Sequence, residues 1–226
     1  VDGGRERVTH LLFNKDGTAT AFGEGGVFYR LQEDGITWKK TQTAIHFLLL
    51  DGSFANDTIG ALVGTGGTIL FTEDSGLTWE KASLLGDTDT RFNSVFFTNS
   101  KHAIAVGNQG RIFRTTGGGR LWRQIEPVTK LNLTDVYFIS QTTGWAVGED
   151  GIMIQTSDGG TTWIDVDTHV THRLEVGLPG VHRAERLAQC LPHSRAGGRR
   201  RVPRLPEIRE VVFVQDHAVV LEAQTT

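Results

Sequence analysis

Short apolar stretches separated by turns run through most of the chain. Val95 and Phe97 stand two positions apart in one of these stretches, and Val136 and Phe138 do so in another. A period of two is typical of a half-buried β-strand, because successive side chains point to opposite faces of the sheet. Glycine-bounded loops and tight turns lie between the stretches, and nothing from Val8 to Thr168 has the pattern of a helix. The pattern predicts an all-β structure.

The strand pattern repeats with a period of just over forty residues. Four tryptophans mark the copies, at steps of 41, 43 and 41 residues: Trp38, Trp79, Trp122 and Trp163. A glycine precedes each tryptophan by three positions: Gly35, Gly76, Gly119 and Gly160. Each period divides into four short strands, the last of which starts at the tryptophan. Four antiparallel strands per period correspond to one propeller blade. We therefore predict a β-propeller of four-stranded antiparallel blades.

The turn before each tryptophan has its own chemistry. Thr72–Trp79 and Thr156–Trp163 both read S/T-x-D-x-G-x-T-W, which resembles the Asp-box, or bacterial neuraminidase repeat. The aspartate accepts hydrogen bonds from backbone N–H groups, the glycine supplies a positive φ, and the tryptophan packs between blades. We predict these structural roles for six residues: Asp74, Gly76, Trp79, Asp158, Gly160 and Trp163. The first copy is degenerate around Asp34, and the third has Gly117 in place of the aspartate.

Composition narrows the classes of function. The formal net charge of −3 predicts no general affinity for nucleic acid or membranes. The single cysteine, Cys190, excludes an intrachain disulfide framework and a cysteine-rich metal site. The sequence has no apolar run of about 18 residues, so we expect no membrane insertion. The histidines lack metal-ligand spacing, and Gly117–Gly119 precedes a strand instead of a phosphate-binding helix. We expect neither a metal nor a cofactor.

One group of cations indicates a binding role. The group consists of five arginines. Four of them fall in the third and fourth strands of one predicted blade, and the fifth occupies a matching position in the first blade: Arg111, Arg114, Arg120, Arg123 and Arg30. Guanidinium groups gathered on one face suit the recognition of acidic or carboxylate-bearing partners. The alternative interpretation is that they are ordinary solvated strand residues.

Four carboxylates are the candidates for catalytic residues if the protein is an enzyme. Asp74 and Asp158 recur at one position of the repeat, which favours a structural role over catalysis. Glu24 and Glu149 share a loop position in two blades, and two carboxylates about 5–10 Å apart would suit a glycosidase. We interpret these glutamates as solvated loop residues. An exo-sialidase also needs a tyrosine nucleophile, whereas both tyrosines lie inside strand patterns.

The composite L-x-x-V-x-F…G-W-A-V-G-x-x-G-x-I-x-x-T-x-D-G-G-x-T-W, at Leu133–Trp163, resembles the repeat of the photosystem II assembly and stability factor family. The resemblance covers Val8–Thr168. It implies a seven-bladed propeller in the periplasm or the thylakoid lumen; an extracellular location is the other expectation. It also implies a non-enzymatic chaperone that binds the newly made D1 precursor, a membrane-protein assembly intermediate, through an arginine-rich surface. Arg111–Arg123 is the candidate for that surface.

Two classes of function stay open. The favoured class is a non-catalytic protein-binding propeller that acts as an assembly chaperone or scaffold. The alternative is a glycoside hydrolase or carbohydrate-binding propeller of the sialidase or xyloglucanase type, because such glycosidases carry similar boxes.

The repeat divides the chain into three parts. Residues 1–168 hold the recognisable blades, residues 169–206 form a divergent arginine-rich segment, and residues 207–226 match part of a further blade at Ile208–Val214. Seven blades of this period need about 290 residues, so we expect four blades and part of a fifth from a longer propeller. Uncovered blade edges then predict a tendency to associate.

The segment Leu174–Arg204 breaks the pattern. Eight arginines lie between Arg173 and Arg204, and they cannot all be desolvated cheaply in a propeller core. Three interpretations compete: a functional basic insertion, a disordered linker, and translation of a shifted reading frame. We predict that the segment forms no normal blade, with some helix around Val181–Cys190.

Overall fold

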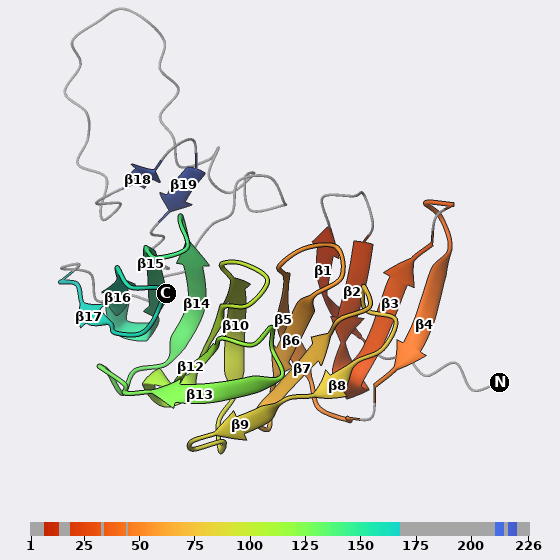
Figure 1. Ribbon diagram of the computed structural model, residues 1–226, viewed down its shortest axis with the longest axis horizontal. Helices are drawn as coiled ribbons and strands as arrows, with labels where there is room; N and C mark the ends of the chain where they lie inside the picture. Colours follow the sequence, from red (N-terminus) through yellow and green to blue (C-terminus); the bar gives the residue numbers. More distant parts are fainter. Residues whose placement is uncertain are drawn as a thin grey trace, which may run out of the picture.

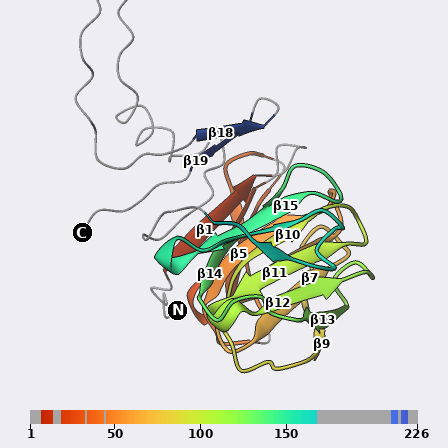
Figure 2. The ribbon, with the colours of Figure 1, turned by 90° about the vertical axis from the view of Figure 1, so that its left-hand side faces the viewer.

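A computed structural model of the protein describes residues 7–13, 19–32, 34–43, 45–167, 211–214 and 217–220. The strands of residues 8–165 form four successive sheets, which we call blades 1 to 4. Figure 1 shows them side by side, with blade 1 at one end of the row and blade 4 at the other. Figure 2 looks at the row from the side of blade 4 and shows the sheets one behind another. The predicted all-β fold of four-stranded blades is confirmed.

The strands of each blade follow one another in chain order. Blade 1 contains β1 (Val8–Phe13), β2 (Ala19–Gly23), β3 (Val27–Leu31) and β4 (Trp38–Gln42). Blade 2 contains β5 (Leu49–Phe54), β6 (Gly60–Gly64), β7 (Thr68–Thr72) and β8 (Glu80–Lys81). Blade 3 contains β10 (Phe92–Phe97), β11 (Ala103–Gly107), β12 (Ile112–Thr115) and β13 (Leu121–Ile125). Blade 4 contains β14 (Leu133–Phe138), β15 (Gly144–Gly148), β16 (Met153–Thr156) and β17 (Ile164–Asp165).

Three features of the strands differ from the sequence prediction. The first strand of blade 2, Leu49–Phe54, contains Gly52, which leaves a gap in the apolar pattern that the sequence predicts for a half-buried strand. The missing side chain at Gly52 makes room for Leu62, whose methyl carbon lies 2.5 Å from where a Cβ would stand. Blade 3 has an additional strand, β9 (Ser83–Leu85), which pairs in parallel with β13. The only helical residues among those described are three single 3₁₀ turns: η1 (Glu24–Gly26), η2 (Asn108–Gly110) and η3 (Glu149–Gly151).

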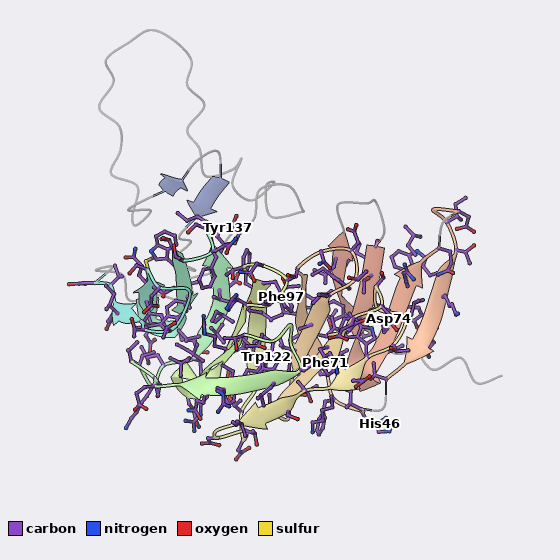
Figure 3. The ribbon with its side chains drawn as sticks, viewed as in Figure 1. His46, Phe71, Asp74, Phe97, Trp122 and Tyr137 are labelled. Carbon is purple, nitrogen blue, oxygen red and sulfur yellow. The ribbon has the colours of Figure 1, made fainter. Side chains whose placement is uncertain are left out.

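The two faces of every blade serve two different interfaces. We call the face toward the preceding blade the leading face and the face toward the following blade the trailing face. On β12, Ile112 packs into the core shared with blade 4, whereas Phe113 packs into the core shared with blade 2. The period of two along the strand thus supplies both interfaces. In Figure 3, Phe71, Phe97 and Trp122 lie between the second and third sheets, where all three join one core.

The repeated tryptophan belongs to the leading face, and its burial depends on the blade before it. Trp122 is fully buried and Trp163 is 5% exposed, as predicted for Trp163. Trp79 was also predicted to be buried, but it is only partly buried; its ring packs edge-on against Phe28 and Phe54. Trp38 is 40% exposed.

The described residues near the C-terminal end form a hairpin of β18 (Val211–Val214) and β19 (His217–Val220). Both strands overlap segments that the sequence assigned to a further blade. The divergent segment 169–206, including Leu174–Arg204 and the expected helix at Val181–Cys190, lies outside the described residues.

Candidate functional site

The turn that joins the third and fourth strands of blade 4 is organised by Asp158. Its Oδ1 accepts hydrogen bonds from the N–H groups of Thr161 (3.0 Å) and Thr162 (2.9 Å) and from the Thr156 hydroxyl (2.9 Å). Its Oδ2 accepts the Thr162 hydroxyl at 2.7 Å. Thr156 Oγ in turn accepts the Gly160 N–H at 3.0 Å, while Gly160 has a φ of +79° that favours glycine. The turn is therefore a closed network around one carboxylate.

Blade 2 contains the same network, and blade 1 contains part of it. Asp74 accepts the Thr78 N–H at 2.9 Å, the Thr78 hydroxyl at 2.6 Å and the Thr72 hydroxyl at 2.8 Å. Figure 3 marks Asp74 near the blade 1 side of blade 2. Asp34 accepts the N–H groups of Ile36 and Thr37 at 2.9 and 2.8 Å. The first copy, degenerate in sequence, thus retains its aspartate contacts.

The hydrogen bonds of these turns hold the aspartates in the ionised form. Desolvation raises the pKa of Asp158, but the N–H and hydroxyl of Thr162 and the other turn donors outweigh it and lower the pKa below its usual value. Asp74 follows the same balance, with its pKa lowered by Thr78 and Thr72 against desolvation. Carboxylates committed to local donors in this way support a structural role in the turn.

The five predicted arginines do not form one cluster. Arg111, at the η2 end of β12, forms an ion pair with Asp87. Arg120, in the turn at the opposite end of β12, forms a bidentate pair with Glu73 of blade 2. Its guanidinium carbon also lies 5.3 Å from the centre of the Phe71 ring. These two arginines tie neighbouring segments together.

Arg114 and Arg123 form the remaining pair in blade 3. They are directly opposite each other on β12 and β13, and they therefore share the trailing face toward blade 4. Arg114 is half-buried and donates from Nε to the carbonyl oxygen of Gly159, at 2.9 Å, in the blade 4 turn. Arg123 is exposed, and its side chain makes no ion pair with the described residues. We call Arg114 and Arg123 the basic pair of blade 3.

Blade 1 has a basic pair at the matching position. Arg30 lies opposite Lys39 across β3 and β4, as Arg114 lies opposite Arg123. Lys39 was not among the predicted binding residues. Its position one residue after Trp38, the same offset as Arg123 from Trp122, was the signal that would have found it.

A histidine lies near the basic pair of blade 3. Burial first, and then the positive charges of Arg114 and Lys101, lower the pKa of His102. Its Nδ1–H donates to Oδ1 of Asn99 at 3.0 Å. The imidazole is therefore held neutral near neutral pH, beside an electropositive patch.

The two glutamates considered for glycoside chemistry lie in different blades. Glu24 is in η1 of blade 1 and pairs with Arg7 at 3.2 Å. Glu149 is in η3 of blade 4 and accepts a hydrogen bond from Asn132 at 2.8 Å. Blades 2 and 3 lie between them, and each glutamate is bonded to the segment that leads into its own blade. The structure does not bring them together as a catalytic pair.

The first strands of the blades carry a polar link that the sequence analysis missed. Ser94 on β10 is 4% exposed, and its Oγ lies 2.7 Å from Asp51 of blade 2 and 2.9 Å from Asp135 of blade 4. The three residues occupy equivalent positions just after the β-bulge of each first strand. A polar residue recurring there in an otherwise apolar strand was the signal. The hydrogen bonds of Ser94 join blades 2, 3 and 4.

The described residues contain no group of three or more histidine, cysteine, aspartate or glutamate side chains placed to hold a metal ion. Within the same residues, no helix is long and apolar enough to cross a membrane.

Four-stranded sheets joined face to face, with an aspartate-centred turn in three of the four, define a repeat-built β-propeller. The chain matches the family model described as "Photosynthesis system II assembly factor YCF48" over residues 30–132 and 120–182. Together these stretches cover more than half of the sequence. The chain belongs to the photosystem II assembly factor family, as the repeat resemblance predicted.

Solved structures agree with this assignment. A structure titled "YCF48 bound to D1 peptide" is 29% identical, with a TM-score of 0.55, over 62% of this chain and 47% of that chain. YCF48 from Cyanidioschyzon merolae is 20% identical, with a TM-score of 0.57, over 69% of this chain and 52% of that chain. An ancestral GH74 enzyme shares the fold at 15% identity, with a TM-score of 0.58, over 70% of this chain and 24% of that chain. The chain spans about half the length of these YCF48 structures. No curated protein matches it.

Proposed function

We propose that this propeller is a non-catalytic protein-binding module that acts in photosystem II assembly, and that the basic pair of blade 3 is part of its binding surface. Family membership supports the assembly role, and the relative bound to a D1 peptide supports a peptide-binding role. The observation that carries the choice of site is the placement of Arg123 directly opposite Arg114. A location outside the cytoplasm is part of the same proposal.

The charge arrangement argues for a ligand at this position. Like charges directly opposite each other on neighbouring strands destabilise a sheet, and an anionic acceptor bound between them would offset that repulsion. The Arg114 Nε bond to Gly159 uses one donor and leaves the terminal nitrogens of that guanidinium for other acceptors. Arg123 offers five N–H donors from an exposed position. A peptide segment with carboxylates fits such donors, because guanidinium and carboxylate groups pair with two parallel hydrogen bonds.

The proposed site differs from the other arginines of the blade. Arg111 and Arg120 are committed to Asp87 and Glu73, so they are less available to a partner. No observation on the described residues favours glycoside hydrolysis over binding, since Glu24 and Glu149 are in separate blades. The likeness to GH74 enzymes is a likeness of fold.

The test is a titration of a fluorescently labelled D1 peptide into the full chain, followed by anisotropy. Arg123→Glu should weaken binding about ten-fold or more, because it replaces attraction by repulsion at the basic pair. Arg91→Glu is the matched control, since Arg91 is an exposed arginine that precedes β10 and lies outside the basic pair. Equal effects of the two reversals, or no binding by the wild type at low salt, would refute the proposal.

A further inference from the structure

Blade 3 has one strand more than the other described blades. Blades 1, 2 and 4 have four strands each, whereas β9 adds a fifth strand to blade 3, outside β13. In Figure 1, β12, β13 and β9 follow one another toward the lower edge of the row of sheets. The trailing face of blade 3 is therefore wider than the four-stranded sheet of blade 4 that packs on it.

One row of side chains crosses this face over all five strands. The strand registers align five residues, one from each strand: Phe96, Ile104, Arg114, Arg123 and Leu85. Residues aligned in this way on neighbouring strands point to the same side of a sheet. Phe96 and Ile104 belong to the core shared with blade 4, whereas Leu85 is 46% exposed. Blade 4 thus covers the inner part of the row and leaves its outer end open.

The cover of blade 4 ends at the half-buried Arg114, whose Nε donates to the Gly159 carbonyl oxygen at 2.9 Å. Beyond this contact, Arg123 is exposed and forms no ion pair with the described residues. Leu121 stands two residues before Arg123 on β13, so it points to the same face, and it is 38% exposed. We call Leu85, Leu121 and Arg123 the ledge of blade 3.

The ledge combines one cation with two aliphatic side chains. The trailing-face residues of β13 and β9 include no carboxylate; they are Leu121, Arg123, Ile125, Ser83 and Leu85. Single exposed leucines are ordinary surface features. Two of them beside an unpaired guanidinium are different, because one ligand can cover the leucines and supply the carboxylate.

We infer that the ledge of blade 3 binds an extended segment of the partner protein in which a large aliphatic residue stands two positions from an acidic residue. The inference rests on the proposed function, since the acidic residue binds at the basic pair. An extended chain advances about 3.3 Å per residue, so two residues span about 6.6 Å. The same rise separates Leu121 from Arg123 along β13. The aliphatic side chain therefore covers Leu121 while the carboxylate reaches Arg123.

Leu85 has a different part in this site. Neighbouring strands lie about 4.8 Å apart, which places Leu85 directly beside Arg123 on the side away from Arg114. There it contacts the methylene groups of the bound acidic side chain and keeps water from the ion pair. An ion pair is stronger where water is excluded, because the local dielectric constant is lower.

Fluorescence anisotropy of the full chain with three labelled synthetic peptides of equal length tests the inference at low salt. In the first peptide leucine and glutamate alternate, with one serine between them. The second has serine in place of every leucine, and the third has glutamine in place of every glutamate. The wild type should bind the first about ten-fold more tightly than either of the others, which corresponds to covering about half of a leucine side chain or to losing the ion pair.

Two variants of the ledge separate its parts. Leu121→Ser should weaken binding of the first peptide about three- to ten-fold and leave the second unchanged, because the second has no leucine to cover. Leu85→Ser should weaken binding of both glutamate-containing peptides about three-fold, because it admits water to the ion pair. The comparison of the first two peptides on the wild type does not depend on how either variant folds.

Leu77→Ser is the matched control, since Leu77 is 55% exposed in the turn between β7 and β8 of blade 2, outside the ledge. It should bind the first peptide as the wild type does. Equal binding of the first two peptides by the wild type, or an effect of Leu77→Ser as large as that of Leu121→Ser, would overturn the inference.

Arg123→Glu distinguishes this inference from the proposed function. If it weakens binding of the first peptide while the leucines of the peptide and of the ledge make no difference, the inference is wrong and the proposed function stands. If Arg123→Glu binds the first peptide and the D1 peptide as the wild type does, the proposed function is wrong and the inference falls with it.

Discussion

The turns of blades 3 and 4 allow the aspartate network to be removed at one place and created at another. Asp158→Ala deletes the carboxylate that organises the blade 4 turn. Gly117→Asp adds one at the equivalent position in blade 3. The site is open, because a Cβ on Gly117 would meet no atom within 4 Å. Thr115 already accepts the Gly119 N–H at 3.3 Å, as Thr156 accepts that of Gly160.

The expected magnitudes follow from the contacts and their exposure. Hydrogen bonds to charged groups contribute about 1.5–3 kcal/mol in favourable sites, but these turn amides can be solvated when the carboxylate is lost. We therefore expect Asp158→Ala to cost about 1–2 kcal/mol. Gly117→Asp should raise the free energy of unfolding by only about 0.5–1 kcal/mol. The gain is smaller than the loss in Asp158→Ala because blade 3 has Leu121 where blade 4 has Thr162, whose hydroxyl completes the network. The gain includes the lower backbone entropy of the unfolded chain when a glycine is replaced.

Urea unfolding, read by tryptophan fluorescence, measures both changes in the free energy of unfolding. Asp158→Asn adds a pH test. Because the folded-state pKa of Asp158 is lowered, its stabilisation is present above the unfolded-state pKa and is lost as the pH falls through the folded-state pKa. The difference between the wild type and Asp158→Asn should shrink in acid. A Gly117→Asp protein less stable than the wild type, or an Asp158→Ala protein of unchanged stability, would refute the reasoning.

Three further predictions concern packing and pH. Gly110→Ala should lower the free energy of unfolding by about 3 kcal/mol, because its Cβ would stand 2.0 Å from a backbone carbonyl oxygen. Gly25→Ala has open space around its Cβ and should cost only about 1 kcal/mol, from the left-handed backbone conformation. Urea unfolding compares the two variants. Trp122→Ala should cost about 3–5 kcal/mol and Trp38→Ala clearly less, and equal losses would contradict the assigned burial. Burial first, and neighbouring cations second, lower the pKa of His102 in the folded protein. The contribution of neutral His102 to stability is therefore present above the unfolded-state pKa and is lost as the pH falls through the folded-state pKa. His102→Asn should therefore flatten the pH dependence of the melting temperature below the ordinary histidine pKa of about 6.5.

Much of the fold could be predicted because the same strand and turn pattern occurs four times in the sequence. The tryptophan spacing and the S/T-x-D-x-G-x-T-W turns located every blade, and the carboxylates of Asp74 and Asp158 accept backbone hydrogen bonds within those turns. The parallel strand β9 was not predictable, because Ser83–Leu85 is too short to have a period of its own. Its pairing is set by the path of the linker, which is a tertiary property.

The candidate site was predicted less well. Sequence proximity grouped Arg111 with Arg120, but β12 separates them, and nearby carboxylates occupy both. The pairing of Arg114 with Arg123 depends on strand register, which becomes visible only once the two strands are aligned. The link through Ser94 depends on three blades meeting, and one copy of the repeat cannot reveal it.

The most direct test of the central claim is hydrogen–deuterium exchange of the full chain with and without the D1 peptide. We predict slower exchange in residues 112–125, which contain β12, β13 and the basic pair, and loss of that protection in Arg123→Glu. Unchanged exchange throughout the chain at saturating peptide, or protection that persists in Arg123→Glu, would contradict the account.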